Sequence, residues 1–219
     1  MNTEEILKEI AEQTAECMLC KLHYSRKKAV PGSGSPRTSI MFIGESPGFH
    51  ENQQGLPFVG AAGKFLDELL EIANLSREEV FITNVVKCRP PGNRDPHVEE
   101  LEACKPYLER QINAINPDVI VTLGRISMSY FVTNGKISSI HGRKFWSNGR
   151  MIVPMYHPAA ALHQPSLKDL VKADFSRLPA LIKESQETRK SNPNLSTTDK
   201  VEDQDEANDD GKTEQLSLF

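Results

Sequence analysis

The stretch Ser39-Ile40-Met41-Phe42-Ile43-Gly44-Glu45-Ser46-Pro47-Gly48 decides the fold. Its first half is an apolar run, typical of a strand buried on both faces, and its second half has the glycine and proline of a turn. Further apolar runs follow at residues 80–86, 118–124 and 152–156. Segments with helical spacing accompany them at residues 4–17, 61–73, 98–115 and about 166–184. This alternation predicts an α/β fold, a parallel sheet with helices on both faces.

Polar and glycine residues gather at one edge of the predicted sheet. The turn 44–48 ends the first strand, Asn84 interrupts the second, and His157 follows the fourth. In sheets of this kind, ligands bind beyond the carboxyl ends of the strands. We therefore expect the functional site at this edge.

Charge and hydropathy bear on the partners and the cellular location of the chain. Its net charge is −4, but residues 186–219 carry nine acidic and four basic side chains, so the preceding residues sum to +1. A nearly neutral body can still gather Lys and Arg on a face that binds phosphates. No apolar run approaches the ~20 residues of a membrane helix, and no signal-peptide pattern opens the chain. We expect a cytoplasmic monomer with no membrane partner.

The cysteines predict a metal site. Cys17 and Cys20 form a C-x2-C pair, while Cys88 and Cys104 form C-x15-C. A single cysteine is most simply explained as a buried thiol, but this explanation is poor for a set of four with this spacing. Disulfides are disfavoured because the cytoplasm is reducing. Four thiolates suit zinc or an iron–sulfur cluster, and the spacing does not separate the two. Because all four positions are filled by protein, the predicted site is structural.

The sheet edge also carries the groups needed to bind a flat polar ring. The turn 44–48 offers backbone N–H donors and the Glu45 carboxylate, and Phe58 can stack on a ring. The amide of Asn84 matches the O4 and N3–H edge of uracil and not that of cytosine. His157 can donate to a developing anion. Each residue alone has an ordinary structural explanation, but their convergence favours a functional pocket.

These motifs resemble those of the family 4 uracil-DNA glycosylases. That family has GE-x-PG, GxPFVG-x-AG, TNVVKCRPP-x-NR-x-P and an HPA loop, which stand here at residues 44–48, 55–63, 83–96 and 157–159. The resemblance covers residues 17 to about 180. It implies a three-layer α/β/α sandwich with a four-stranded parallel sheet, and a [4Fe–4S] cluster in preference to zinc. It also implies a monofunctional enzyme of base-excision repair, which flips uracil out of DNA and hydrolyses its N-glycosidic bond.

The resemblance implies roles for individual residues. His157 would stabilise charge on uracil O2, Glu45 would position the water, and Asn84 would read the base edge. Glu51 would exclude the methyl group of thymine, and Leu162 would wedge into the duplex. The substrate-binding set is Gly44, Glu45, Ser46, Pro47, Gly48, Glu51, Phe58, Asn84, His157 and Leu162.

Two departures from related enzymes bear on the chemistry. Ser46 stands where this family often has Ala and where family 1 enzymes have a water-activating Asp, so no strong general base is evident there. In a related subgroup, a His in a basic insertion links the enzyme covalently to DNA. This chain lacks the insertion, and its nearby His97 lies in an ordinary helix-entry segment. We therefore expect an enzyme that turns over and not one that stays trapped on DNA.

Two rival interpretations come from other classes of protein. A non-catalytic, cluster-bearing DNA-binding module would leave Phe58, Asn84 and His157 without a shared purpose. A Rossmann-type enzyme would use the glycine turn for phosphate, but the sequence lacks G-x-G-x-x-G and the P-loop lysine motif.

The end of the chain has its own composition. We expect a folded domain at residues 1–185, then a disordered acidic linker at 186–214, where apolar residues nearly vanish. The final residues 215–219 resemble the QL[S/D]LF motif by which bacterial repair proteins bind the sliding clamp. Gln215 would bond at the rim of the clamp's pocket, and the apolar side chains would fill it: Leu216, Leu218 and Phe219. A bacterial β-type clamp is favoured over an archaeal one, and packing of the tail on the domain is the alternative.

Overall fold

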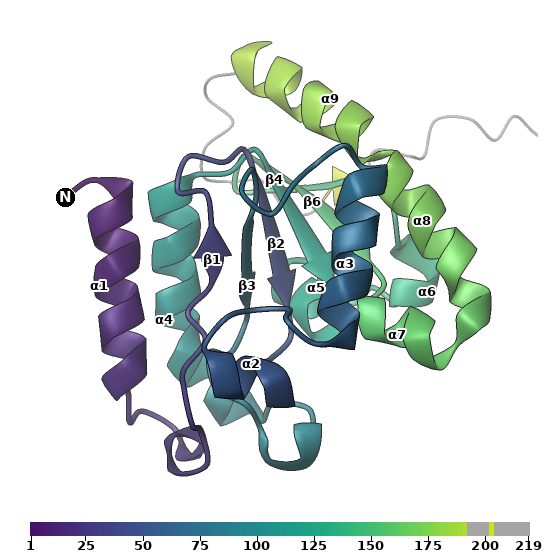
Figure 1. The fold of residues 1–219 in the computed structure, drawn as a ribbon. Coiled ribbons are helices and arrows are strands. Elements are labelled where there is room, and N and C mark those ends of the chain that lie inside the picture. The colour runs from purple at the N-terminus through teal and green to yellow at the C-terminus, as the bar shows by residue number, and fades with distance from the viewer. Residues whose placement is uncertain (192–201, 204–219) are drawn as a thin grey trace, which may run out of the picture.

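The computed structural model describes residues 1–191 and the short strand 202–203. Helices and strands alternate along the chain, as the sequence predicts (Figure 1). The elements are α1 (Thr3–Glu16), η1 (Lys21–Tyr24), β1 (Ser33–Gly34), β2 (Ile40–Gly44), α2 (Phe49–Gln54), α3 (Ala61–Ile72), β3 (Phe81–Asn84), η2 (Pro91–Asn93), α4 (Val98–Ile115), β4 (Val119–Leu123), α5 (Arg125–Phe131), α6 (Ile137–Ile140), β5 (Phe145–Ser147), β6 (Arg150–Met155), α7 (Pro158–His163), η3 (Pro165–Leu167), α8 (Lys168–Ser176), α9 (Leu178–Ser191) and β7 (Glu202–Asp203).

One sheet runs through the molecule in the order β1-β3-β2-β4-β6-β5-β7. Its centre, β3-β2-β4-β6, is parallel, which confirms the four predicted strands. A four-stranded sheet was expected, and this number is too low. Three further strands, β1, β5 and β7, pair antiparallel with their neighbours and extend the sheet at its two edges. The β5–β6 hairpin turns at Asn148 and Gly149, both at positive φ (50° and 70°). Asn-Gly is a strong hairpin signal in sequence, so this strand could have been predicted.

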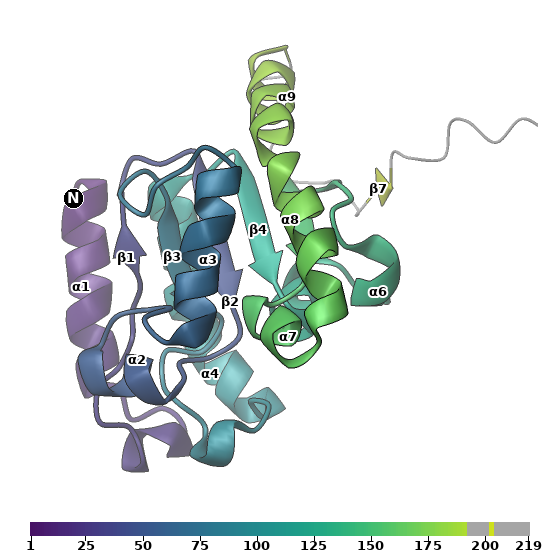
Figure 2. The ribbon, with the colours of Figure 1, turned by 45° about the vertical axis from the view of Figure 1, so that its right-hand side comes forward.

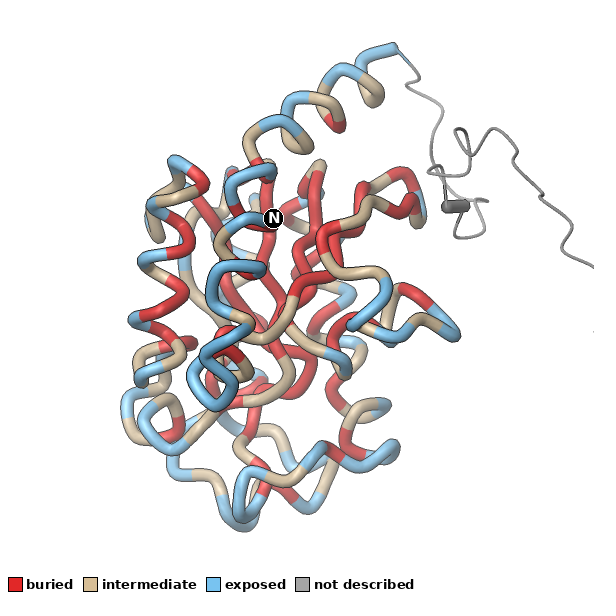
Figure 3. Tube along the Cα trace, turned by 90° about the vertical axis from the view of Figure 1, so that its right-hand side faces the viewer, coloured by how far each residue is buried: buried red, intermediate tan, exposed pale blue. Residues whose placement is uncertain are grey.

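The sheet lies between two layers of helices. Alternate side chains of a strand point to opposite faces, so Ile40 and Phe42 pack toward α3 and α8, while Met41 and Ile43 pack toward α4 and α5. Figures 1 and 2 show α1 on the outer side of α4. In Figure 3 the buried residues follow the strands and the inner faces of the helices. The predicted three-layer α/β/α sandwich is confirmed.

The last helix differs from its prediction. Instead of one helix at 166–184, the chain forms η3, α8 and α9, and Pro179 stands in the first turn of α9, where its missing N–H is tolerated. Helix α9 continues to Ser191, so the boundary predicted at residue 185 falls inside it. Two hydrogen bonds fasten α9 to the start of β4, from Ser185 Oγ to the Asp118 carbonyl (2.9 Å) and from Arg189 to the Asp118 carboxylate (2.6 Å).

The predicted linker and clamp peptide are mostly outside the described residues. Within residues 186–214 the structure describes the end of α9 and strand β7, and residues 215–219 are not described. Across the described part of the chain, no helix is both long and apolar enough to cross a membrane.

Candidate active site

A pocket of about 370 Å³ opens where β2, β3 and β6 end. Strands β2 and β3 run in parallel with Gly44 opposite Asn84, so the turn after β2 and the end of β3 meet at one edge of the sheet. The lining residues are Glu45, Ser46, Pro47, Gly48, Glu51, Phe58, Ala62, Asn84, Asn93, His157, Ala159 and His163. The structure therefore brings together eight of the ten residues predicted to bind substrate.

The other two predicted residues, Gly44 and Leu162, lie beside the pocket. A Cβ atom on Gly44 would approach Asn84 Oδ1 to 2.4 Å and Phe58 Cζ to 2.7 Å, so glycine lets both side chains close over the end of β2. Leu162 is 38% exposed on α7, one residue before the lining residue His163. Its side chain is thus on the surface close to the pocket.

Asn84 has a side-chain oxygen in the pocket wall that lacks a hydrogen-bond donor within the described residues. The residue is 1% exposed, and within the described residues its Oδ1 atom has no hydrogen-bond partner. A buried acceptor that lacks a donor costs roughly 1–3 kcal/mol. A ligand N–H group would remove this cost, so the wall is suited to a ligand that donates at that point.

His157 is oriented by its own backbone. Its Nδ1 atom accepts a hydrogen bond from the Ala159 amide (3.1 Å), so the neutral ring carries its proton on Nε2. Burial lowers the pKa of His157 to about 4, although the negative charge of Glu51 opposes the shift. At neutral pH the side chain is therefore an uncharged donor. Its ring stacks on Phe58, with centroids 5.5 Å apart.

The lowered pKa of His157 predicts a change of stability with pH. The unfolded chain binds a proton at His157 below about pH 6.5, but the folded protein does so only near pH 4. Unfolding therefore takes up a proton between these values, and acidification from pH 6.5 to 4 should lower the free energy of unfolding by ~3 kcal/mol. Chemical denaturation at several pH values measures this. The drop should be smaller in His157→Gln, and an equal drop in both proteins would contradict the assignment.

The loop that carries Phe58 is held from two sides. Phe58 has a φ of 51°, which is rare for a residue with a side chain. Glu51 Oε1 accepts hydrogen bonds from the amides of Val59 (2.8 Å) and Gly60 (3.0 Å). On the other side, the Arg77 guanidinium donates to the carbonyls of Pro57 and Phe58. Sequence reasoning missed Arg77, because its surroundings are ordinary surface residues and its partners, the loop carbonyls and the Asp67 carboxylate, meet it only in the folded chain.

Glu45 lies half-buried at the pocket rim. Burial raises its pKa, the carboxylate of Asp95 raises it further, and the charge of Arg125 partly opposes both. Arg125 and Asp95 form an ion pair (2.5 Å). Asp95 belongs to the quoted motif 83–96, but Arg125 follows β4 and no sequence signal marks it.

Four lining residues were also absent from the prediction. They are Ala62, Asn93, Ala159 and His163. The first three fall inside the motifs quoted for the family resemblance, so membership of the motif was the signal that could have found them. His163 lies in the last turn of α7 and had no such signal.

The cysteines surround a separate cavity. Cys17, Cys20, Cys88 and Cys104 line it together with Arg26 and Tyr107. Cys104 lies in α4, inside the helix predicted at residues 98–115. Burial raises the pKa of Cys20, Cys88 and Cys104, the last to about 12. Within the described residues, no three His, Cys, Asp or Glu side chains are arranged to hold a metal ion.

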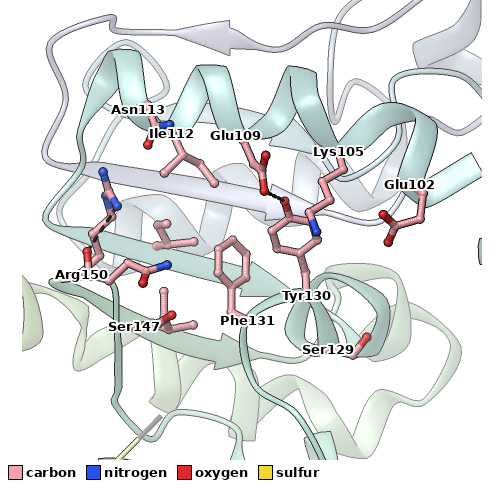
Figure 4. Close-up of a pocket in the computed structure, with 13 residues that line it drawn as sticks. Glu102, Lys105, Glu109, Ile112, Asn113, Ser129, Tyr130, Phe131, Ser147 and Arg150 are labelled. Carbon is pink, nitrogen blue, oxygen red and sulfur yellow. Dashed lines mark hydrogen bonds between the residues drawn. The ribbon is translucent and has the colours of Figure 1, made fainter. Parts of the chain in front are cut away.

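A larger pocket of about 500 Å³ lies between α4, α5 and the β5–β6 hairpin (Figure 4). Its wall includes apolar Ile112 and Phe131, with Lys105 and Arg150 also in the lining. None of the predicted site residues lines it. The smaller pocket at the sheet edge is therefore the candidate active site, because it holds the amide, the imidazole and the carboxylates.

Comparison with known proteins identifies the family. A model of the Uracil DNA glycosylase superfamily matches residues 31–178. The type-4 uracil-DNA glycosylase of Saccharolobus solfataricus is 50% identical over 179 residues, which cover 77% of this chain and 83% of that protein. The chain belongs to the type-4 uracil-DNA glycosylases. Two further relatives with that name come from Archaeoglobus fulgidus (43% identity, covering 84% of this chain and 97% of that protein) and Thermotoga maritima (43%, 82% and 96%).

The match to the uracil-DNA glycosylase superfamily contains the whole pocket. Every lining residue falls within 31–178, as do Cys88 and Cys104, whereas Cys17 and Cys20 precede this segment. The resemblance stated from the sequence motifs is thus confirmed for the family.

Proposed function

We propose that this uracil-DNA glycosylase removes uracil from DNA in the pocket at the sheet edge, by hydrolysis of the bond between the base and deoxyribose C1′. The base must leave the helical stack first, since the bond is out of reach inside a duplex. The buried Asn84 Oδ1 atom, which lacks a partner within the described residues, carries the assignment. It requires a ligand with an N–H group, and uracil has one at N3.

Base recognition follows from Asn84 and Phe58. Asn84 Oδ1 would accept the N3–H of uracil, and its amide NH2 would donate to O4. Cytosine has an acceptor at N3 and a donor at C4, so both contacts would become repulsive. Phe58 provides an apolar wall on which the base can stack. Together they select an uncharged ring with the polar pattern of uracil.

His157 would stabilise the leaving group. As the glycosidic bond breaks, the electron pair passes to uracil and negative charge grows on O2. Because Nδ1 is occupied by the Ala159 amide, the Nε2–H group is the donor available to O2. A neutral donor fixed in place before the reaction stabilises the developing anion without reorganisation. The backbone N–H groups of Glu45 and Ser46 would add further donors.

The remaining predicted residues would control water, selectivity and DNA. Glu45, whose pKa is raised by burial, would orient the attacking water at C1′. Glu51 would fill the space beside C5 and reject thymine, since its carboxylate is fixed by two amides. Leu162, exposed next to the pocket, would enter the duplex and replace the flipped base.

A strand-cleavage assay tests this function. Oligonucleotides that differ only by uracil, cytosine or thymine at one position are incubated with the protein and then treated with alkali, which cuts at abasic sites. Cleavage of the uracil strand alone is expected. No cleavage of any strand, together with retained DNA binding, would favour the non-catalytic module. Cleavage of the thymine strand would contradict the role of Glu51.

For the cysteines we propose an iron–sulfur cluster. The donors fit the group, since four cysteines from the segment between α1 and η1, the loop after β3 and α4 line one cavity. Four thiolates suit zinc or a cluster, and the resemblance to the type-4 enzymes favours the cluster. When bound, the cluster would supply a structural cross-link. Arg26 would brace it, because it donates to the Cys17 carbonyl (2.5 Å) and lies 3.7 Å from Cys88 Sγ.

Iron content tests the cluster. We expect protein purified without oxygen to be brown, and each of the four Cys→Ser variants to lose iron to a similar extent, because every thiolate holds one corner of the cluster. Absorbance and iron analysis measure this. A colourless, active protein that holds one zinc ion would contradict the proposal.

For the end of the chain we propose the sliding clamp as partner, with a monomeric domain that includes all of α9 and not only residues 1–185, and with the residues after β7, up to 214, as a tether. The support is sequence alone: a glutamine, two leucines and a phenylalanine end an otherwise polar segment. Tethering would raise the local concentration of the enzyme at newly copied DNA.

Deletion of residues 215–219 tests this partner. We expect the deletion to abolish binding to a bacterial β-type clamp in calorimetry and to leave uracil release from a short oligonucleotide unchanged. Ser217→Ala is the control, because it keeps Gln215 and the apolar side chains. Undiminished clamp affinity after the deletion would contradict the proposal. A matching loss of activity would instead mean that the tail packs on the domain.

A further inference from the structure

Lys87 is a fully buried lysine that the mechanism above does not use. It is 1% exposed and follows β3 by three residues. Its Nζ atom donates three hydrogen bonds, each of 2.7 Å: to the Asn84 carbonyl, Thr83 Oγ1 and Gln111 Oε1. Burial of this nitrogen without hydrogen-bond partners would cost free energy of folding. Its three acceptors remove that cost, and together they form a buried polar network around Lys87.

The network joins the two sites of the molecule. On one side, the side chain of Lys87 holds the backbone of Asn84, whose own side chain faces the pocket. On the other, the Lys87 amide donates to Cys104 Sγ (3.3 Å), and its neighbour Cys88 lines the cysteine cavity. Gln111 adds a link to α4, the helix that carries Cys104.

The network is also anchored to the segment before β1. Gln111 Nε2 and Thr83 Oγ1 both donate to the Pro31 carbonyl (2.7 and 2.8 Å), and the Val30 amide donates to the Lys87 carbonyl (2.7 Å). Lys87 is thus fixed by main-chain and side-chain contacts together. The end of β3 cannot shift without breaking several of these bonds.

We infer that Lys87 is a positioning residue for uracil recognition: it holds the backbone at Asn84 so that the unpartnered Oδ1 stays aimed at the base. This inference rests on the proposed role of Asn84. A displacement of about 1 Å at a reacting or recognising group can cost on the order of 10²-fold in rate. Loss of the Nζ donors should therefore slow uracil release through Asn84 and not by a separate route.

A double-mutant cycle with Lys87→Met and Asn84→Ala tests this route. Methionine keeps most of the stem and removes the three donors. We expect Lys87→Met to lower the single-turnover rate on a uracil oligonucleotide about 10–100-fold in the wild-type background, and less than about threefold in the Asn84→Ala background. Lys144→Met is the matched control, because Lys144 is a half-buried lysine paired with Glu184 (2.7 Å), and its rate should not change.

The other outcomes of the cycle are equally informative. Equal losses in both backgrounds would overturn the inference about Lys87 and leave Asn84 in place. A wild-type rate for Asn84→Ala would instead refute the proposed function at this residue. Iron per chain is measured in parallel, and a loss of iron that matches the loss of rate would also overturn the inference. If Lys87→Met does not fold, Thr83→Val removes one acceptor of Nζ with little change of shape and enters the same cycle.

Discussion

Replacement of His157 by alanine should lower the single-turnover rate of uracil release by ~10²–10³-fold. The reason is the loss of a donor whose direction is set before the substrate arrives, since the Ala159 amide occupies Nδ1 and leaves Nε2–H toward the pocket. Rapid-quench measurements with enzyme in excess report this step directly. Affinity for a duplex that already contains an abasic site should change little, because the uracil anion is absent from that complex.

His157→Gln gives a graded comparison for the same position. Its side-chain amide can donate from nearly the same place, so the loss should be smaller than for alanine. A His157→Ala enzyme that releases uracil at the wild-type rate would show that the imidazole is only part of the α7 cap. An equal loss of abasic-site affinity would show instead that the variant disturbs DNA binding.

Gly44→Ala should have an effect of similar size, on the order of 10²-fold. The added methyl group would meet Asn84 Oδ1 at 2.4 Å and Phe58 Cζ at 2.7 Å, so both recognition side chains must move. The same crowding should lower the free energy of unfolding by about 1–3 kcal/mol. Single-turnover kinetics and chemical denaturation measure the two effects separately.

Gly60→Ala is the matched control for Gly44→Ala. Its new Cβ would find the nearest atom, in His50, at an ordinary 3.4 Å, and its φ of −83° suits any residue. The rate should stay within about threefold of wild type. If both variants lose activity equally, close packing at Gly44 is not the cause, and the arrangement of Asn84 and Phe58 would need revision.

The parts of the fold that were predictable from sequence are those with local, repeated patterns. The four parallel strands are continuous apolar runs, and α4 was predicted at its observed bounds because its acidic first turn and its spacing agree. Strands β1 and β7 have two residues each, too few to show any period. The break between α8 and α9 was missed because both halves share one pattern of apolar residues.

The residues of the candidate site also fall into those that sequence could predict and those that it could not. Residues that touch the pocket lie in short motifs, so Glu45, Asn84 and His157 could be named in advance. Arg77 and Lys87 could not, because they act on backbone carbonyls that only the folded chain brings to them. The sequence also left the tautomer of His157 open, since it depends on the turn that returns the Ala159 amide to the ring.

The attachment of α9 has a consequence for how the enzyme could work while held by another protein. Its hydrogen bonds to Asp118 fix it at the amino end of β4, and Figure 1 shows α9 at the opposite end of the molecule from α2 and the turn after β2. Beyond α9, strand β7 pairs with β5 at one edge of the sheet, so a partner that holds the chain beyond Asp203 would pull first on that edge. That edge contributes no residue to the pocket, so under the proposed attachment to the clamp the load would bypass the site.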